Sequence, residues 1–298
     1  MFELHQVGAQ SYFIESPAKI GLYAAAETDV YLIDSGNDKD AGRRVRKLLD
    51  ARGWRLKGIL NTHSHADHIG GNRYLQQNLG CTVFCGGIEG AFTEHPVLEP
   101  SFLYGGCPPA DLRHKFLMAQ DSAVLPLTDP AFPREVAVIP LPGHSYDMVG
   151  YRTPDGTVFL ADCISSAATL EKYQVSFIYD VAAYLQTLDT VERLQAPAFI
   201  PAHTEPLTAE TLPALVAVNR AKVCEIADKL AALCAAPADF ETLLKALFDT
   251  YGLTMNFEQY VLVGSTVRSY LAWLKDTGRV SAQFRDNRLL WQTAAPTA

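Results

Sequence analysis

The feature that most constrains this chain is a dense group of histidines that directly follows a short apolar run. Residues 57–60 are strand-like, and residues 63–68 then read His-Ser-His-Ala-Asp-His. Imidazole and carboxylate groups are ligands that first-row divalent metals accept. In a loop, His63 and His65 can face one ion while Asp67 and His68 face a neighbouring one. The pattern therefore predicts a metal-binding loop at a strand end, in preference to a loop of solvated histidines.

Three later strand ends carry residues of the same types. His144 follows the apolar run 136–139, Asp162 follows the run 158–161, and His203 follows the run 198–201. An isolated histidine at such a position would more often be a hydrogen-bonded loop residue. Five of the eight histidines nevertheless lie in these motifs. That concentration favours the ligand interpretation for His144 and His203.

The order of the remaining runs predicts an α/β layered domain. Apolar or β-branched runs indicate strands at 2–7, 11–14, 20–24, 29–33 and 57–60, with helices at 38–52 and 69–79. After residue 134, strands are expected at 136–139, 148–153, 158–161 and 198–201, with a helix at 179–194. Alternation of strands and helices in this way is typical of sheets covered by helices.

Residues 86–134 form a proline-rich insert in which little regular structure is expected. A long irregular segment inside a compact domain is often a lid or a substrate-binding loop. Tyr104, Arg113 and Lys115 in this insert, and Tyr146 close to His144, are candidates for substrate contact. Ordinary packing or a solvated charge is the favoured alternative for each of the four.

The amino-acid composition of the chain changes after residue 205. Residues 206–298 are rich in alanine and leucine and predict helices at 212–235, 240–251 and 265–276, followed by strands at 279–284 and 288–291. Three helices and a small hairpin are the pattern of a winged-helix module. We therefore expect a catalytic domain over 1–205, with the lid-like insert at 86–134, and a helical, winged-helix-like module over 206–298.

Charge and composition narrow the function classes. The 25 Lys and Arg against 33 Asp and Glu give a net charge of −8, all of it before residue 206. That balance disfavours a broad polyanion-binding surface. No stretch approaches the ~18 uncharged apolar residues of a membrane span, and no signal peptide is visible. The six cysteines form no Cys-x-x-Cys pair, which excludes a zinc ribbon and favours reduced thiols in a cytoplasmic protein.

The series of strand-end motifs over roughly residues 10–205 resembles the metallo-β-lactamase fold superfamily of hydrolases. The resemblance implies an αββα sandwich and a ligand set for two ions. By that resemblance His63, His65 and His144 would hold one metal, Asp67, His68 and His203 the second, and Asp162 would bridge both. Asp34, in Tyr-Leu-Ile-Asp-Ser-Gly, matches the early aspartate that supports the metal loop. The helical, winged-helix-like tail is similar to that of a glyoxalase II-like / LACTB2-like branch of the superfamily, which includes the LACTB2-like ribonucleases.

The expected function is that of a dinuclear metal-dependent hydrolase. Two divalent ions, zinc by default, with iron or manganese as alternatives, would hold a bridging hydroxide that Asp67 orients. Charge favours a small thioester, ester or lactone as substrate. The alternative is a phosphodiesterase or endoribonuclease whose tail presents RNA. A non-catalytic metal-binding relative is disfavoured because every ligand position is filled, and a homodimer through the tail stays open.

Overall fold

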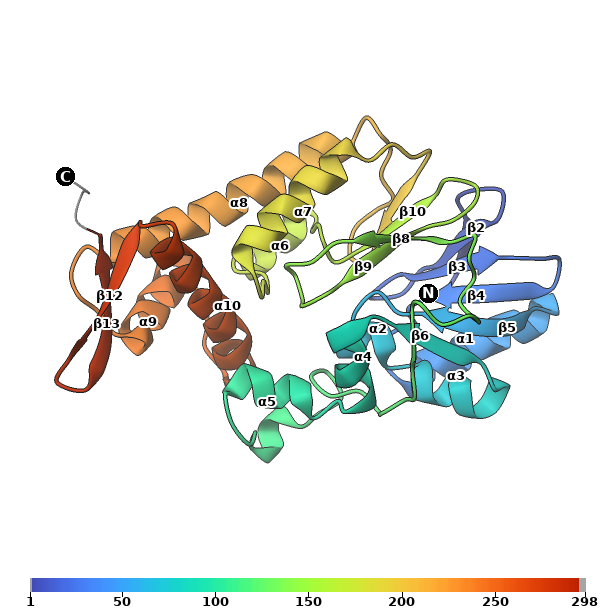
Figure 1. Cartoon of the computed structure of the whole chain (residues 1–298), viewed down its shortest axis with the longest axis horizontal. Coiled ribbons are helices and arrows are strands. Elements are labelled where there is room, and N and C mark those ends of the chain that lie inside the picture. The colour runs from blue at the N-terminus through green and yellow to red at the C-terminus, as the bar shows by residue number, and fades with distance from the viewer. Residues whose placement is uncertain (1, 295–298) are drawn as a thin grey trace.

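The computed structural model describes residues 2–294, and its larger sheet has seven strands in chain order (Figure 1). The strands from β1 to β4 pair antiparallel, and those from β4 to β7 pair parallel. The parallel part places the carboxyl ends of β4 and β5 side by side. The strands are β1 (Leu4–Gln6), β2 (Ser11–Ile14), β3 (Ile20–Ala24), β4 (Asp29–Ile33), β5 (Arg55–Leu60), β6 (Thr82–Cys85) and β7 (Leu125–Pro126).

The second sheet has four strands in the order β11-β10-β9-β8. They are β8 (Ala137–Pro140), β9 (Val149–Arg152), β10 (Val158–Ala161) and β11 (Phe199–Pro201). The two sheets enclose one hydrophobic layer. In it Phe13 and Leu60 from the first sheet are buried with Tyr151, Phe159 and Ile200 from the second. The pairing of β10 with β11 is parallel, so these two strands also end at one edge.

Helices cover the outer face of each sheet. Val45, Leu49 and Leu75 are buried against the first sheet, and Leu188 and Val191 belong to the core beside the second. This arrangement confirms the predicted αββα sandwich. The outer helices are α1 (Lys39–Arg52) and α3 (Asn72–Leu79) on the first sheet, and α7 (Val181–Arg193) on the second, while α6 (Ala167–Tyr173) packs against α8 (Leu212–Leu233).

The helix predicted at 69–79 is divided in the structure into α2 (Ala66–Ile69) and α3. Gly70 and Gly71 lie at the break. A Cβ atom at Gly70 would collide with the backbone of Asn37, and one at Gly71 with the carbonyl oxygen of Ser35. Because Gly70 and Gly71 have no Cβ atom, this segment can lie directly against the residues that follow β4.

The insert 86–134 contains more regular structure than the sequence predicts. It holds α4 (Gly87–Glu94), α5 (Leu98–Tyr104), a 3-10 turn η1 (Ala110–Leu112) and β7. The first helix has no side-chain cap of its own. Instead Asp147, distant in sequence, accepts hydrogen bonds from the backbone N–H groups of Ile88 and Glu89 at 3.1 Å each. A cap supplied from another segment leaves no local sequence signal.

The C-terminal elements follow the predicted order of three helices and a hairpin. The last helix begins eight residues earlier than expected, where the Asn256 side chain accepts from the N–H of Gln259. Gly264 lies inside this helix, near Phe240 and Leu244. The elements are α8 (Leu212–Leu233), α9 (Phe240–Tyr251), α10 (Phe257–Asp276), β12 (Val280–Arg285) and β13 (Arg288–Thr293). Their assignment to the winged-helix class stays a prediction.

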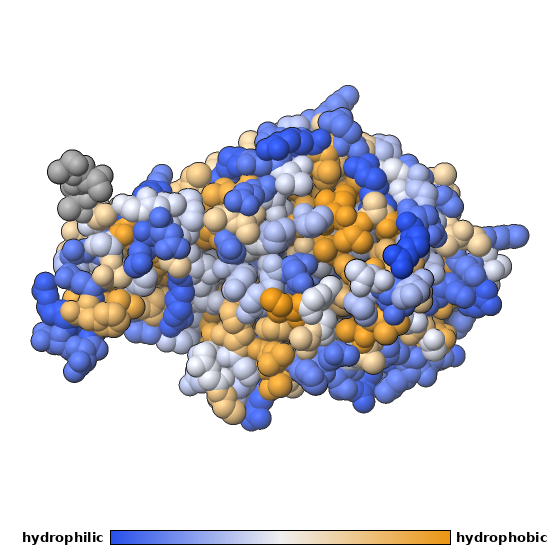
Figure 2. Space-filling model, in the orientation of Figure 1, coloured by the Kyte–Doolittle hydropathy of each residue, from blue (hydrophilic) through white to orange (hydrophobic). Residues whose placement is uncertain are grey.

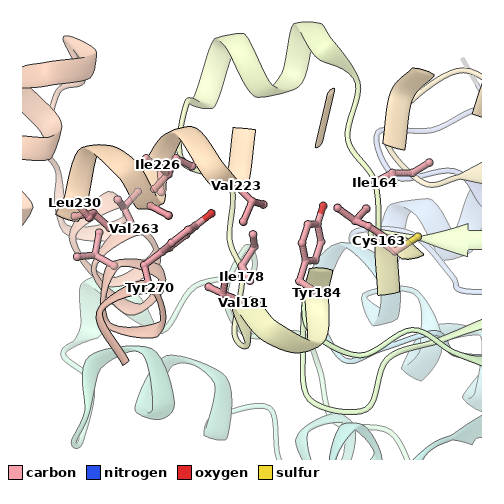
Figure 3. Packing of buried hydrophobic residues seen from close by; sticks show 14 of the residues in the cluster. Cys163, Ile164, Ile178, Val181, Tyr184, Val223, Ile226, Leu230, Val263 and Tyr270 are labelled. Atoms are coloured by element: carbon pink, nitrogen blue, oxygen red, sulfur yellow. The ribbon is translucent and has the colours of Figure 1, made fainter. Parts of the chain in front are cut away.

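The C-terminal helices share one hydrophobic core with the second sheet (Figure 3). In the view of Figure 3, Val223 of α8 lies between Tyr270 of α10 and Tyr184 of α7. Tyr184 also donates a hydrogen bond to Asn219 of α8 at 3.3 Å. A continuous core of this kind fixes α10 relative to the sandwich. The division of the chain at residue 205 into two domains stays a prediction.

The molecule is elongated, with the hairpin β12–β13 at the end opposite the first sheet (Figure 1). Figure 2 shows hydrophilic residues at both ends of the long axis and hydrophobic residues gathered between them, around β8 and β9. Within residues 2–294, no helix is long and apolar enough to cross a membrane.

The shared core yields a prediction that compares two valines of α8. Val216 is fully buried in the core, whereas Val218 is 41% exposed. Val216→Ala should lower the free energy of unfolding by about 2 kcal/mol, because it removes buried methyl groups and leaves a cavity. Val218→Ala should change it by less than about 0.5 kcal/mol. Urea unfolding followed by circular dichroism measures both, and equal effects would contradict the shared core.

Candidate metal centre

The seven predicted ligands come from four segments at one edge of the sandwich. The segment after β5 carries His63 and His65 in a loop and Asp67 and His68 in α2, and the loop between β8 and β9 carries His144. Asp162 directly follows β10, and His203 follows β11. The parallel strands β10 and β11 bring their carboxyl ends to this edge, and the turn between the antiparallel strands β8 and β9 brings His144 to it.

Three histidines form the first cluster. Nε2 of His63 lies 3.1 Å from Nδ1 of His65, and Nε2 of His144 lies 3.0 Å from the same Nδ1. Burial lowers the pKa of His65 and of His144 to about 4, and it holds the pKa of His63 well below its ordinary value. The three rings are therefore neutral near pH 7, which is the form of imidazole that binds metal.

The second cluster contains Asp67, His68, Asp162 and His203, whose ligand atoms lie within 4.8 Å of one another. Nε2 of His203 is 3.3 Å from Asp67 and 3.2 Å from Asp162. Asp162 also lies 3.3 Å from Nε2 of His68 and 3.6 Å from Nε2 of His144. Its carboxylate thus stands between the two clusters.

The negative charges of the carboxylates in the second cluster favour the binding of cations. Asp162 raises the pKa of His203 to about 10, against the opposing effect of burial. Burial would lower the pKa of His68, but Asp162, Asp67 and Asp34 raise it well above its ordinary value. The buried carboxylates thus draw protons onto both rings. A divalent cation supplies the same positive charge without a proton.

Two buried polar atoms of this cluster indicate that its residues fit a metal ion. Nε2 of His68 and Oδ1 of Asp162 face each other at 3.3 Å, but neither completes a hydrogen bond among residues 2–294. A buried polar atom without a partner costs about 1–3 kcal/mol. Both atoms belong to the second cluster, and both are of types that divalent metals accept. The donor set therefore fits metal ions.

The ring nitrogens that face away from the clusters are anchored. Nδ1 of His68 lies 2.7 Å from Asp34, Nδ1 of His144 lies 3.1 Å from the carbonyl of Phe177, and Nδ1 of His203 lies 2.9 Å from the carbonyl of Pro17. Such contacts fix the tautomer and the ring orientation of a metal ligand.

Asp34 ties the end of β4 to the histidine loop. It accepts 2.8 Å hydrogen bonds from the backbone N–H and the hydroxyl of Thr62, in addition to its contact with His68. Its backbone has a positive φ of 62°, which is uncommon outside glycine and is often found at functional positions. This geometry is compatible with the support role that the resemblance implies.

Sequence reasoning missed Glu89 of α4, which connects two ligand loops. Its side chain is buried and accepts from the N–H and hydroxyl of Ser64 at 2.9 and 2.5 Å. It also accepts from the hydroxyl of Ser145 at 2.6 Å and from the N–H of Asp147 at 3.3 Å. Ser64 lies between His63 and His65, and Ser145 follows His144. Glu89 therefore holds both loops of the first cluster.

A cavity of about 560 Å³ opens onto the centre. Of the four predicted substrate contacts, Lys115 lines it, and its ammonium lies 3.1 Å from Asp38. Tyr146 packs among aromatic rings and Tyr104 lines a separate groove; these two and Arg113 are not part of the cavity wall that the structure describes. The wall, as far as residues 2–294 define it, consists of Asn37, His65, Ala66, Asp67, Glu99, Lys115, Phe116, Leu117, His144, Asp162, Tyr173, Phe177, Glu258, Gln259 and Leu262.

Comparisons with known proteins agree with this geometry. The sequence profile of the metallo-beta-lactamase superfamily matches residues 14–203. A hydroxyacylglutathione hydrolase from Bradyrhizobium sp. is 30% identical over 160 residues, which cover 52% of each chain. A beta-lactamase-like protein 2 homolog from Drosophila melanogaster is 25% identical, covering 59% of this chain and 58% of that protein.

The match to a solved structure extends over nearly the whole chain. A beta-lactamase domain protein from Burkholderia ambifaria superposes with a TM-score of 0.73 at 15% identity, covering 98% of this chain and 94% of that one. At that identity the likeness concerns the fold. By sequence, the chain spans only about half or less of the length of the curated hydroxyacylglutathione hydrolases it matches.

The contacts of Glu89 predict a role in metal retention. Glu89→Gln replaces an acceptor oxygen by an N–H group that faces other donors, so it should weaken metal binding by roughly 10- to 100-fold. Glu94→Gln, an exposed position on the same helix, is the matched control. Metal retained against a chelator series measures the effect, and equal retention by the two variants would show that Glu89 does not hold the ligand loops.

Proposed function

Because this chain belongs to the metallo-beta-lactamase superfamily, we propose that it is a dinuclear metal-dependent hydrolase of small thioesters, esters or lactones. The observation that carries the proposal is the position of Asp162 between two complete ligand clusters. His63, His65 and His144 would hold one ion, and Asp67, His68 and His203 the other, with Asp162 shared. Zinc suits these ligands, and iron and manganese accept the same types.

The bound metal ions and the side chains of the protein would have different roles in the reaction. When bound, two divalent ions supply a hydroxide nucleophile near neutral pH and polarise the scissile carbonyl. Asp67 lines the cavity and is 41% exposed at its side chain. One of its oxygens contacts His203, and the other would accept a hydrogen bond from the attacking water. Phe177 makes edge-to-face contacts with His65 and His144 at centroid distances of 5.3 and 5.7 Å.

The size of the cavity supports a small substrate. About 560 Å³ lies within the range of roughly 300–1,000 Å³ that is common for small-molecule sites. The wall combines the metal-site residues with Phe116 of the insert and Leu262 of α10. Segments from three parts of the chain thus enclose a space suited to a compact ligand.

The ribonuclease alternative has weaker support from the surface charges. The tail's basic residues are engaged within the protein or lie at its far end. Arg279 pairs with Asp228 at 2.7 Å, and the guanidinium of Arg268 stacks over Phe240 at 3.6 Å. Arg285 and Arg288 flank the hairpin turn. These positions do not form a basic path toward the cavity, which a strand of RNA would require.

The proposal predicts hydrolysis of acyl thioesters, esters or lactones in preference to single-stranded RNA. Asp162→Asn should abolish turnover, because an amide is a weak bridge between cations, whereas the exposed Asp50→Asn should leave it unchanged. A substrate panel assayed at low and moderate salt measures both effects. RNA cleavage that falls steeply with salt, without acyl hydrolysis, would overturn the proposal, as would full activity of Asp162→Asn.

A further inference from the structure

We propose that the cavity selects substrates whose non-reacting part is apolar and uncharged or cationic, and that Glu258 of α10 disfavours anionic substrates. This inference rests on the proposed hydrolase function and deepens it. It separates this chain from an enzyme specialised for glutathione thioesters. Glutathione carries two carboxylates and one ammonium group, so its thioesters are anionic at neutral pH.

The outer wall of the cavity is apolar and comes from distant segments. Phe116 belongs to the insert and Tyr173 ends α6, and their exposed fractions are 63% and 47%. Leu117, Phe177 and Leu262 complete the apolar wall. Exposed apolar side chains that gather on the wall of one cavity suit the apolar parts of a ligand.

The charged groups of the wall do not suit an anionic ligand. Lys115 is the only lysine or arginine among the lining residues that the structure describes, and Asp38 already neutralises it at 3.1 Å. Glu258 lines the same cavity, is half-buried, and has no cation within 4.0 Å among the ion pairs of residues 2–294. Glu99 is a second acidic residue of the wall, but burial raises its pKa to about 8, so it is mostly neutral near pH 7. A ligand carboxylate at the outer wall would therefore meet the unpaired negative charge of Glu258.

A structural role explains only part of the placement of Glu258. An acidic residue in the first turn of a helix interacts favourably with the helix dipole, and Glu258 occupies that turn of α10. Glu241 occupies the corresponding turn of α9, but it accepts a 2.7 Å hydrogen bond from Tyr260 and does not line the cavity. The two residues share the structural role and differ in their access to the ligand, so Glu241 is a matched control.

The test uses three thioesters with one acyl group and different thiols. The thiols are glutathione, the neutral N-acetylcysteamine and the cationic thiocholine. The wild-type protein should show kcat/KM for the neutral and cationic thioesters at least about tenfold above that for the glutathione thioester. Glu258→Gln should raise the value for the glutathione thioester about fivefold and leave the neutral one unchanged, and the gain should shrink as salt screens the charge.

The outcomes separate this inference from the proposed function. Glu241→Gln should leave all three values unchanged, and thermal melting checks that both variants are folded. Equal or preferred hydrolysis of the glutathione thioester by the wild-type protein would overturn the inference and leave the hydrolase function intact. Failure to cleave any thioester, ester or lactone would overturn both.

Discussion

The buried contact between Asp34 and His68 is the interaction on which the centre depends. It joins the end of β4 to α2 at 2.7 Å, with neither side chain appreciably exposed. A buried ion pair contributes stability only when its remaining atoms also find partners. Asp34 meets this condition through Thr62, whereas Nε2 of His68 faces Asp162 at 3.3 Å without completing a hydrogen bond. The same contact therefore orients His68, a candidate metal ligand, and leaves its Nε2 available to a cation.

The C-terminal helices connect the packing of the molecule to the shape of its cavity. Packing of α8 and α10 on the second sheet places the first turns of α10 beside the metal centre, where Glu258 and Leu262 line the cavity. Figure 1 shows the other end of α10 leading to the hairpin, far from the first sheet. The tail thus completes the cavity wall while the sandwich supplies the candidate metal ligands, and on the proposed function changes in the tail would alter specificity without touching a metal ligand.

The sequence was most informative for the candidate metal ligands, because they lie directly after apolar runs that predict strands. The spacing of His63, His65, Asp67 and His68 within one loop restricts their geometry, and an apolar run before each of the other ligands indicates the edge at which they meet. Glu89 could not be predicted, because its partners lie 25 and 56 positions away and only the tertiary fold brings them together. Likewise, the start of α10 was predicted eight residues too late, because Asn256 was not recognised as the residue that caps it.

The central claim is that this edge of the sandwich holds two metal ions that share Asp162. The most direct measurement is elemental analysis of the protein purified without chelator and after reconstitution, with protein concentration determined by amino-acid analysis. The account predicts close to two divalent ions per chain, because the seven ligand side chains divide into two clusters joined by one carboxylate. A stoichiometry that stays near one after reconstitution with zinc, iron or manganese would contradict it.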